Sequence, residues 1–250
     1  MVGGKVVEAA GHPGVVQVVV NDLEGGRETI CGGALIAPRV VVTAGHCFLN
    51  VPLRRLRPVS VVSGRQWAYP HTDPPAGIHI GVLEVLHAPI DKRIHEPYPD
   101  DVELLRLRRP APFAPLRLGT PAEVRAGTPA RVLGWGLTRE RASESAPRQL
   151  RGLTMRVRSD AVCGRVANGE YHASTQLCLT PRSPAHAEGT CYGDSGTPLL
   201  GADGNTVLGM VSTSNGVCGR AASIYSRLTS GPLRHWVERQ VRAWESSRRS

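Results

Sequence analysis

The sequence lacks several features that would place it in another class of protein. No apolar run approaches the roughly 20 residues that a membrane-spanning helix needs, so we expect no membrane partner. The first residues lack the basic residues, apolar stretch and cleavage site of a secretory signal. No two cysteines have the CxxC spacing of a zinc or thioredoxin-like site. The 250 residues therefore predict one globular, enzyme-sized body.

Lysine is nearly absent, because only Lys5 and Lys92 occur in a chain whose formal net charge is +9. Arginine carries almost all of the positive charge, as a GC-biased genome would produce without a functional cause. The functional alternative is a surface that binds polyanions such as nucleic acid, cell-wall polymer or sulfated sugar. Because the arginines are scattered and not gathered with aromatic residues, we favour the first explanation and expect no specific nucleic-acid partner.

Short segments rich in β-branched residues recur between turn signals, which is typical of an all-β fold. The segments are Val15 to Val20, Arg39 to Thr43, Val59 to Ser63, Ile78 to Leu86, Ala130 to Gly134, Leu150 to Val157 and Thr206 to Ser212. The longest connectors, 65–77 and 89–99, are interpreted as loops. Only the tail predicts a helix, since apolar residues repeat at intervals of three and four after Gly231-Pro232. These apolar residues are Leu233, Trp236, Val237, Val241 and Trp244, and residues 245–250 are expected to fray.

The cysteines are even in number, which favours a disulfide framework made in an oxidising compartment. They are Cys31, Cys47, Cys163, Cys178, Cys191 and Cys218. The eight histidines other than His46 show no metal-ligand spacing, so we expect no metal and no cofactor.

Three short motifs suit the parts of a nucleophilic hydrolase. His46 follows an apolar strand and precedes a cysteine that can brace it, as a general base requires. A carboxylate, Asp100 or Asp101, precedes an apolar strand and can orient the imidazole. Ser195 lies between small residues, where the amides of Gly193 and Ser195 can face a developing oxyanion. Each motif has an ordinary explanation by itself, but the ordered set favours acyl transfer to water.

Six segments together resemble the signature segments of the chymotrypsin and trypsin family of serine proteases, of the bacterial secreted type. They are Val2 to Gly4, Cys31 to Ile36, Thr43 to Cys47, Asp101 to Leu107, Gly134 to Gly136 and Gly193 to Pro198. The resemblance implies a serine endopeptidase with the triad His46, Asp101 and Ser195, and it favours Asp101 over Asp100. It also implies the disulfides Cys31–Cys47, Cys163–Cys178 and Cys191–Cys218.

The fold that the resemblance implies is all-β, with two antiparallel six-stranded barrels and the active site in the cleft between them. The barrels are expected at 1–113 and 114–230, with a closing helix and tail at 231–250, and the peptidase domain covers 1–245. We expect a monomer that acts on protein or peptide substrates and meets protein inhibitors.

Four residues depart from the family pattern. Gly45 stands where an alanine is usual, and Thr197 stands where a glycine is usual and could crowd the backbone. Thr213 and Ser214 replace a tryptophan and a glycine in the strand Ser212 to Ser214, which the resemblance assigns to substrate backbone.

The resemblance assigns the specificity pocket to Gly189, Ser214 and Ser223. An aspartate at the place of Gly189 attracts basic side chains in the family, so we predict a preference for small or medium uncharged side chains. The carboxylate of the neighbouring Glu188 is the main risk to that prediction, although we expect this side chain to point away from the pocket.

The resemblance also implies an activation pair between the amine of residue 1 and Asp194. Met1 stands where the family has Ile or Val, so the native chain is expected to carry a signal and a propeptide and to be secreted. Protein whose chain begins at Met1 should then be weakly active.

Two alternative functions remain: an inactive cationic binding protein on the same fold, and an ester hydrolase of another fold. The ester hydrolase would need a Gly-x-Ser-x-Gly elbow, and this sequence has Thr197 in place of the final glycine of that motif.

Overall fold

A computed structural model of the chain describes residues 1–22, 27–48, 56–68, 77–89, 99–140, 148–167, 171–181, 187–214 and 216–246. The middle parts of the two predicted long loops lie outside the described residues, as do His71, His95, His186 and residues 247–250.

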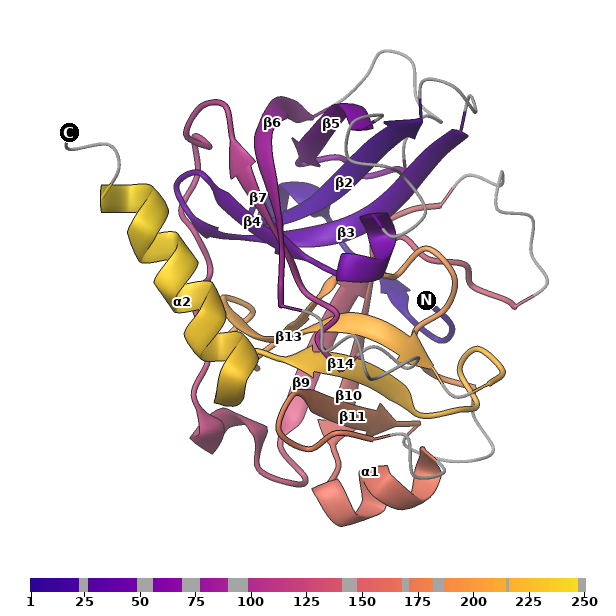
Figure 1. Cartoon of the computed structure of the whole chain (residues 1–250). Helices are drawn as coiled ribbons and strands as arrows, with labels where there is room; N and C mark the ends of the chain where they lie inside the picture. Colours follow the sequence, from indigo (N-terminus) through magenta and orange to yellow (C-terminus); the bar gives the residue numbers. More distant parts are fainter. Residues whose placement is uncertain are drawn as a thin grey trace.

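Two closed antiparallel barrels of six strands each form the body of the protein, which confirms the predicted fold class (Figure 1). The first barrel closes in the order β2-β3-β4-β7-β6-β5. Its strands are β2 (Val15–Asp22), β3 (Arg27–Ala37), β4 (Val40–Thr43), β5 (Leu56–Ser63), β6 (Ile78–His87) and β7 (Glu103–Leu107).

The second barrel closes in the order β9-β10-β11-β14-β13-β12, because β10 pairs with both β9 and β11. Its strands are β9 (Pro129–Gly134), β10 (Arg151–Val157), β11 (Gln176–Thr180), β12 (Pro198–Leu200), β13 (Thr206–Ser214) and β14 (Ser223–Arg227). Two short strands extend this sheet: β1 (Lys5–Val6) pairs with β10, and β8 (Arg117–Leu118) pairs with β13 in parallel. Although β1 lies within residues 1–113, its partner belongs to the second barrel, and the division at residue 113 stays a prediction.

Alternating apolar side chains explain why these segments close into barrels. Val16, Val18 and Val20 of β2 fill the interior of the first barrel, while Met155 and Leu179 help to fill the second. A third apolar cluster contains residues of both barrels and of the C-terminal helix, among them Leu104 and Trp236. The two barrels are therefore packed firmly enough to hold side chains from both in one site.

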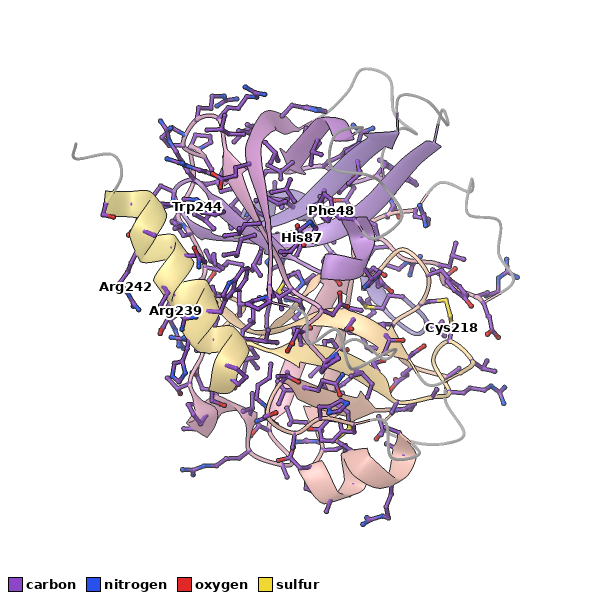
Figure 2. All side chains as sticks on the ribbon, in the orientation of Figure 1. Phe48, His87, Cys218, Arg239, Arg242 and Trp244 are labelled. Carbon is purple, nitrogen blue, oxygen red and sulfur yellow. A yellow bond between two sulfur atoms is a disulfide. The ribbon has the colours of Figure 1, made fainter. Side chains whose placement is uncertain are left out.

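The C-terminal helix α2 (Gly231–Ser246) is confirmed where the apolar periodicity predicts it. Gly231 has φ +79°, and Pro232 follows at the start of the helix, where its missing N–H costs nothing. Trp244 packs near Arg106 of β7, with the guanidinium carbon 6.0 Å from the ring centre, so α2 reaches from the second barrel to the first. Arg239 and Arg242 point away from the body (Figure 2).

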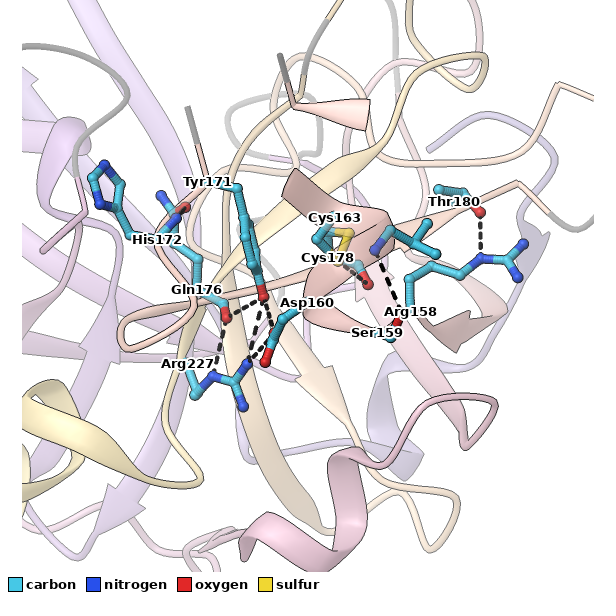
Figure 3. Close-up of a disulfide and its surroundings, with 11 residues drawn as sticks. Arg158, Ser159, Asp160, Cys163, Tyr171, His172, Gln176, Cys178, Thr180 and Arg227 are labelled. Carbon is cyan, nitrogen blue, oxygen red and sulfur yellow. Dashed lines mark hydrogen bonds and ion pairs between the residues drawn. A yellow bond between two sulfur atoms is a disulfide. The ribbon is translucent and has the colours of Figure 1, made fainter. Parts of the chain in front are cut away.

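A second helix, α1 (Asp160–Val166), contradicts the prediction that only the tail is helical. It is seven residues long, which is too short to show an apolar repeat. Ser159 caps its start, and the Cys163–Cys178 disulfide fastens it to β11 (Figure 3). Arg227 of β14 donates a 2.9 Å hydrogen bond to Asp160, the first residue of the helix.

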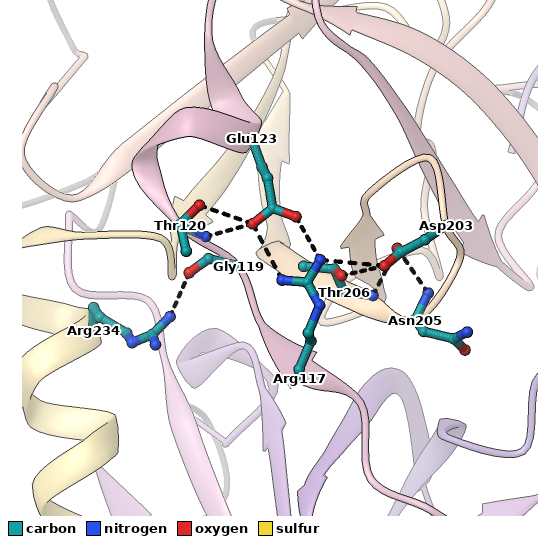
Figure 4. A network of polar contacts seen from close by, with 8 residues as sticks. All are labelled: Arg117, Gly119, Thr120, Glu123, Asp203, Asn205, Thr206 and Arg234. Atoms are coloured by element: carbon teal, nitrogen blue, oxygen red, sulfur yellow. Dashed lines mark hydrogen bonds and ion pairs between the residues drawn. The ribbon is translucent and has the colours of Figure 1, made fainter.

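The segment between the barrels is held by a polar network on the second barrel. Arg117 donates to Glu123 at 2.6 Å and to Asp203 at 3.3 Å, and Glu123 completes a capping box with Thr120 on η4 (Pro121–Val124) (Figure 4). Arg234 of α2 donates to the carbonyl of Gly119 at 2.6 Å.

One further 3₁₀ turn, η1 (Ala9–Gly11), lies near the chain start. None of the helices among the described residues is long and apolar enough to span a membrane.

Candidate active site

His46 lies in a short 3₁₀ turn, η2 (Gly45–Phe48), at the end of β4. The Cys31–Cys47 disulfide fastens this turn to β3, as the resemblance implies. The Nδ1 of His46 lies 2.8 Å from Oδ2 of Asp101, and the backbone N–H of His46 donates to Oδ1 at 2.7 Å. The Asp101 carboxylate therefore orients both the ring and the backbone of His46, while a quarter of the imidazole stays exposed.

Asp101, and not its neighbour Asp100, is the carboxylate that faces His46. It is 2% exposed, and the second barrel reaches it through two serines. The Ser212 hydroxyl donates to Oδ2 at 2.5 Å, and the Ser226 hydroxyl donates to the Asp101 carbonyl at 2.8 Å. Asp101 thus connects the two barrels at the site.

A β-bulge explains how Ser212 points at Asp101. The register of β13 against β14 shifts between Val211 and Thr213, so Ser212 is the extra residue on its strand. Bulges re-aim a side chain out of the normal alternation, often next to an active site. The family resemblance assigns Ser212 only to substrate backbone, and the bulge has no reliable local signal in the sequence.

The loop that carries Ser195 packs directly on the segment that leads to His46. The N–H of Gly32 donates to the Ser195 carbonyl at 2.7 Å. A Cβ at Gly196 would lie 2.4 Å from Thr43 Oγ1 and 3.0 Å from the Ala44 nitrogen, so only glycine allows this approach. Ser195 is therefore held at the junction of the barrels, next to the His46 turn.

Two backbone amides of this loop lack an acceptor. Within the part of the chain that the structure describes, neither the Gly193 nor the Ser195 N–H donates a hydrogen bond to the protein. Backbone N–H groups are rarely left unpaired unless water or a ligand takes the bond. Gly193 has φ +84°, a conformation that favours glycine and turns the local peptides. The two amides are thus available to a substrate oxygen.

Asp194 is fully buried, and its contacts anchor the loop that carries Ser195. Its Oδ1 accepts from Gly136 N–H at 2.8 Å, and its Oδ2 accepts from Cys191 N–H at 3.0 Å. The amine of Met1 lies 3.1 Å from Oδ2 and also donates to the carbonyls of Gly136 and Leu137. Such pairing compensates the cost of burying the carboxylate.

Burial lowers the pKa of the Met1 amine, and the Asp194 carboxylate opposes part of that shift. The Met1 side chain is fully buried in the core of the second barrel, so methionine is accommodated there. The expectation that Ile or Val at position 1 gives higher activity stays a prediction.

The residues assigned to the specificity pocket lie close together. A Cβ at Gly189 would lie 3.2 Å from Gly219 Cα and 3.4 Å from the Ser223 hydroxyl, so a side chain there would project toward Ser223. Thr190 donates to the Ser223 hydroxyl at 2.8 Å, and Ser214 is half-exposed. Glu188 is buried, with its Cγ beside Gly3. The Cys191–Cys218 disulfide joins this region to the Ser195 loop.

Three residues near the site were missed or undervalued in the sequence. Ser226 and Arg148 have no local signal, since their partners are distant along the chain. A Cβ at Gly193 would lie 2.6 Å from Arg148 Nη1, which places this cation beside the candidate oxyanion site. Thr197 was noted only as a departure, but its hydroxyl donates to the Asp194 carbonyl at 2.7 Å.

Comparisons with known proteins give a consistent family and fold. The family model described as Trypsin matches residues 1–237. A protein named Trypsin from Saccharopolyspora erythraea is 31% identical over 237 residues, which cover 91% of this chain and 93% of that protein. Granzyme M of Homo sapiens is 29% identical and covers 87% of this chain and 80% of its own. The structure of human heparin binding protein superposes with a TM-score of 0.74 at 27% identity, covering 95% of each chain.

Proposed function

Since the chain belongs to the trypsin family of serine proteases, we propose that it hydrolyses peptide bonds as an endopeptidase through His46, Asp101 and Ser195. Ser195 Oγ attacks the peptide carbonyl carbon as its proton passes to His46, and His46 then protonates the leaving amine. Water, deprotonated by His46, cleaves the acyl-enzyme and restores Ser195. Asp101 holds the imidazole and stabilises its charged form.

The observation that carries the proposal is the buried Asp101 carboxylate that orients His46, at the junction where the Ser195 loop packs. The unpaired amides of Gly193 and Ser195 support it, because a tetrahedral intermediate needs donors for its oxyanion. Secretion and activation from a zymogen are typical of this family. The three disulfides support an extracellular location, and we propose a monomeric enzyme that protein inhibitors can block.

Labelling with a fluorophosphonate probe tests the proposal. Disulfide-bonded protein should form one adduct on Ser195, and Ser195→Ala should form none and lose about 10⁶-fold in turnover. Peptide mapping of the adduct gives the position. Absence of an adduct in folded wild-type protein would refute the enzyme assignment.

The second candidate is a catalytically weak or inactive cationic binding protein on the same fold. The net charge of +9 and the similarity to human heparin binding protein favour it. Retention on a sulfated-sugar column together with no probe adduct would support this candidate.

We further propose that the enzyme does not prefer arginine or lysine next to the cleaved bond. Gly189 has no side chain that could place a carboxylate beside Ser223, and Ser214 pairs with Ser223 across β13 and β14. We expect these two serines to narrow the pocket. A peptide library should therefore show cleavage after small or medium uncharged residues. Efficient cleavage after arginine would mean that Glu188 or another acid reaches the pocket.

A further inference from the structure

Thr197 occupies a position between the Ser195 loop and β12 that the proposed reaction does not use. We propose that its hydroxyl is a positioning group for the oxyanion site, which holds the Asp194–Ser195 peptide so that the Ser195 N–H faces the substrate oxygen. The inference rests on the proposed protease function and deepens it, because it names a determinant of the same site.

The hydrogen bonds of Thr197 converge on one carbonyl. Its Oγ1 donates to the Asp194 carbonyl at 2.7 Å, and its backbone N–H donates to the same oxygen at 3.0 Å. The Asp194 carbonyl and the Ser195 N–H belong to one peptide unit, which is planar and points these two groups in opposite directions. Fixing the oxygen with two donors therefore fixes the direction of the N–H.

The loop needs such a constraint because of its glycines. Gly193 and Gly196 flank the Asp194–Ser195 peptide with φ of +84° and +70°, and glycine rotates among conformations more readily than other residues. Gly32 N–H already holds the Ser195 carbonyl, which is the next peptide along. Thr197 thus supplies a side-chain constraint on the peptide that carries the candidate donor.

Thr197 is well placed to act as a rigid anchor. It is fully buried, its carbonyl accepts from Val211 N–H at 2.9 Å, and Pro198 after it begins β12. Its methyl group fills space beside two glycines: a Cβ at Gly32 would lie 2.1 Å from Cγ2, and one at Gly134 would lie 3.1 Å away. A β-branched side chain has few rotamers, so the packed methyl group also holds the hydroxyl in place. The crowding expected from Thr197 is avoided because Gly32 has no side chain.

The variants Thr197→Ser and Thr197→Ala test this role as a matched pair. Both remove the same methyl group, and they differ only in the hydroxyl. Removing a whole oxyanion donor costs about 10²- to 10³-fold in kcat, so disordering one donor should cost about 10-fold. We expect kcat of Thr197→Ala to fall about 10-fold below that of Thr197→Ser with KM unchanged, since the donor acts mainly in the transition state.

Amide hydrogen exchange provides a readout that does not depend on activity. The amide of residue 197, which donates to the same Asp194 carbonyl, should lose protection and exchange several-fold faster in Thr197→Ala than in Thr197→Ser, with thermal unfolding confirming that both are folded. Equal kcat and equal protection of the residue 197 amide in the two variants would overturn the proposal and leave Thr197 as a packing residue. If wild-type protein shows no probe adduct, the protease function fails, while the exchange comparison still decides whether Thr197 orders this peptide.

Discussion

The described part of the chain contains two histidine–carboxyl pairs, on carboxyl groups only two residues apart in the chain. His46 Nδ1 lies 2.8 Å from Asp101, and His87 Nδ1 lies 2.6 Å from Glu103. Both carboxyl groups are buried, at 2% and 0% exposure. By residue type, distance and burial, the two pairs look alike.

The number of hydrogen-bond donors separates the two pairs. The Asp101 carboxylate accepts hydrogen bonds from the ring and the backbone N–H of His46 and from the hydroxyl of Ser212. Several donors of this kind stabilise a carboxylate anion. In the described part of the chain, only His87 reaches the Glu103 carboxyl. Burial and the nearby charge of Asp101 raise the pKa of Glu103 to about 9, and burial lowers the pKa of His87.

The raised pKa of Glu103 and the lowered pKa of His87 both favour the uncharged forms of this pair at neutral pH. A His–carboxyl distance alone thus does not identify a catalytic pair. The carboxylate must also have enough donors to stay charged, because only an anion stabilises the imidazolium of the proposed reaction.

The largest effect separates the two histidines. We expect His46→Ala to lower kcat about 10⁶-fold, as loss of the general base does in a serine protease of another fold with the same triad, and His87→Ala to change it less than about 3-fold. Steady-state cleavage of a peptide substrate measures both. Comparable losses in the two variants would show that His46 is not the base.

The two carboxyl groups should differ nearly as much. Asp101→Asn should lower kcat about 10⁴-fold, the loss known for a serine protease triad, because an amide favours the wrong tautomer of His46. Glu103→Gln should leave kcat within about 3-fold of wild type. A small loss in Asp101→Asn would contradict the assignment of Asp101.

The donors to Asp101 provide a finer test. Ser212→Ala removes a donor to the carboxylate, so we expect kcat to fall about 3- to 10-fold at a cost of about 1 kcal/mol of stability. Ser226→Ala is the matched control, since its hydroxyl binds the Asp101 carbonyl and not the carboxylate. It should lose similar stability in urea unfolding with less than about 2-fold change in kcat. Equal activity losses would mean that the hydrogen bond to the carboxylate has no special role.

A further difference concerns the pH dependence of stability. The pKa of Glu103 is raised from 4.5 to about 9 in the folded protein, so the folded state binds this proton more tightly. Its contribution to stability is fully present below pH 4.5 and is lost progressively as the pH rises toward 9. Glu103→Gln cannot ionise, so its stability relative to wild type should rise by roughly 4 kcal/mol between pH 5 and pH 8, at about 1.4 kcal/mol for each pH unit.

Urea unfolding at the two pH values measures this change. The half-exposed Glu84, changed to Gln, serves as the control and should show no such increase. A constant difference between Glu103→Gln and wild type would mean that Glu103 is ionised in the folded state.

The sequence by itself determined the family, the all-β class and the C-terminal helix, and the resemblance to the family implied the disulfide pairs. These features have local signals or ordered motifs, such as the Gly-Pro break and apolar repeat of α2. Strands β1, β3, β8, β11, β12 and β14 were not identified. Strands β1, β8 and β12 have only two or three residues, and buried polar residues such as Ser223 and Ser226 interrupt the apolar pattern of β14. The short helix α1 depends on a cap and a disulfide more than on periodicity.

Only the tertiary structure decided which groups face Asp101, where the Thr197 hydroxyl donates and which histidine–carboxyl pair is neutral. Ser212 and Ser226 reach Asp101 across 111 and 125 residues of chain, through a bulge and a barrel contact that no local pattern encodes. The raised pKa of Glu103 likewise depends on burial and on a shortage of donors. Local residue types set the available chemistry, but the protonation and direction of each group depend on neighbours that only the packed barrels bring together.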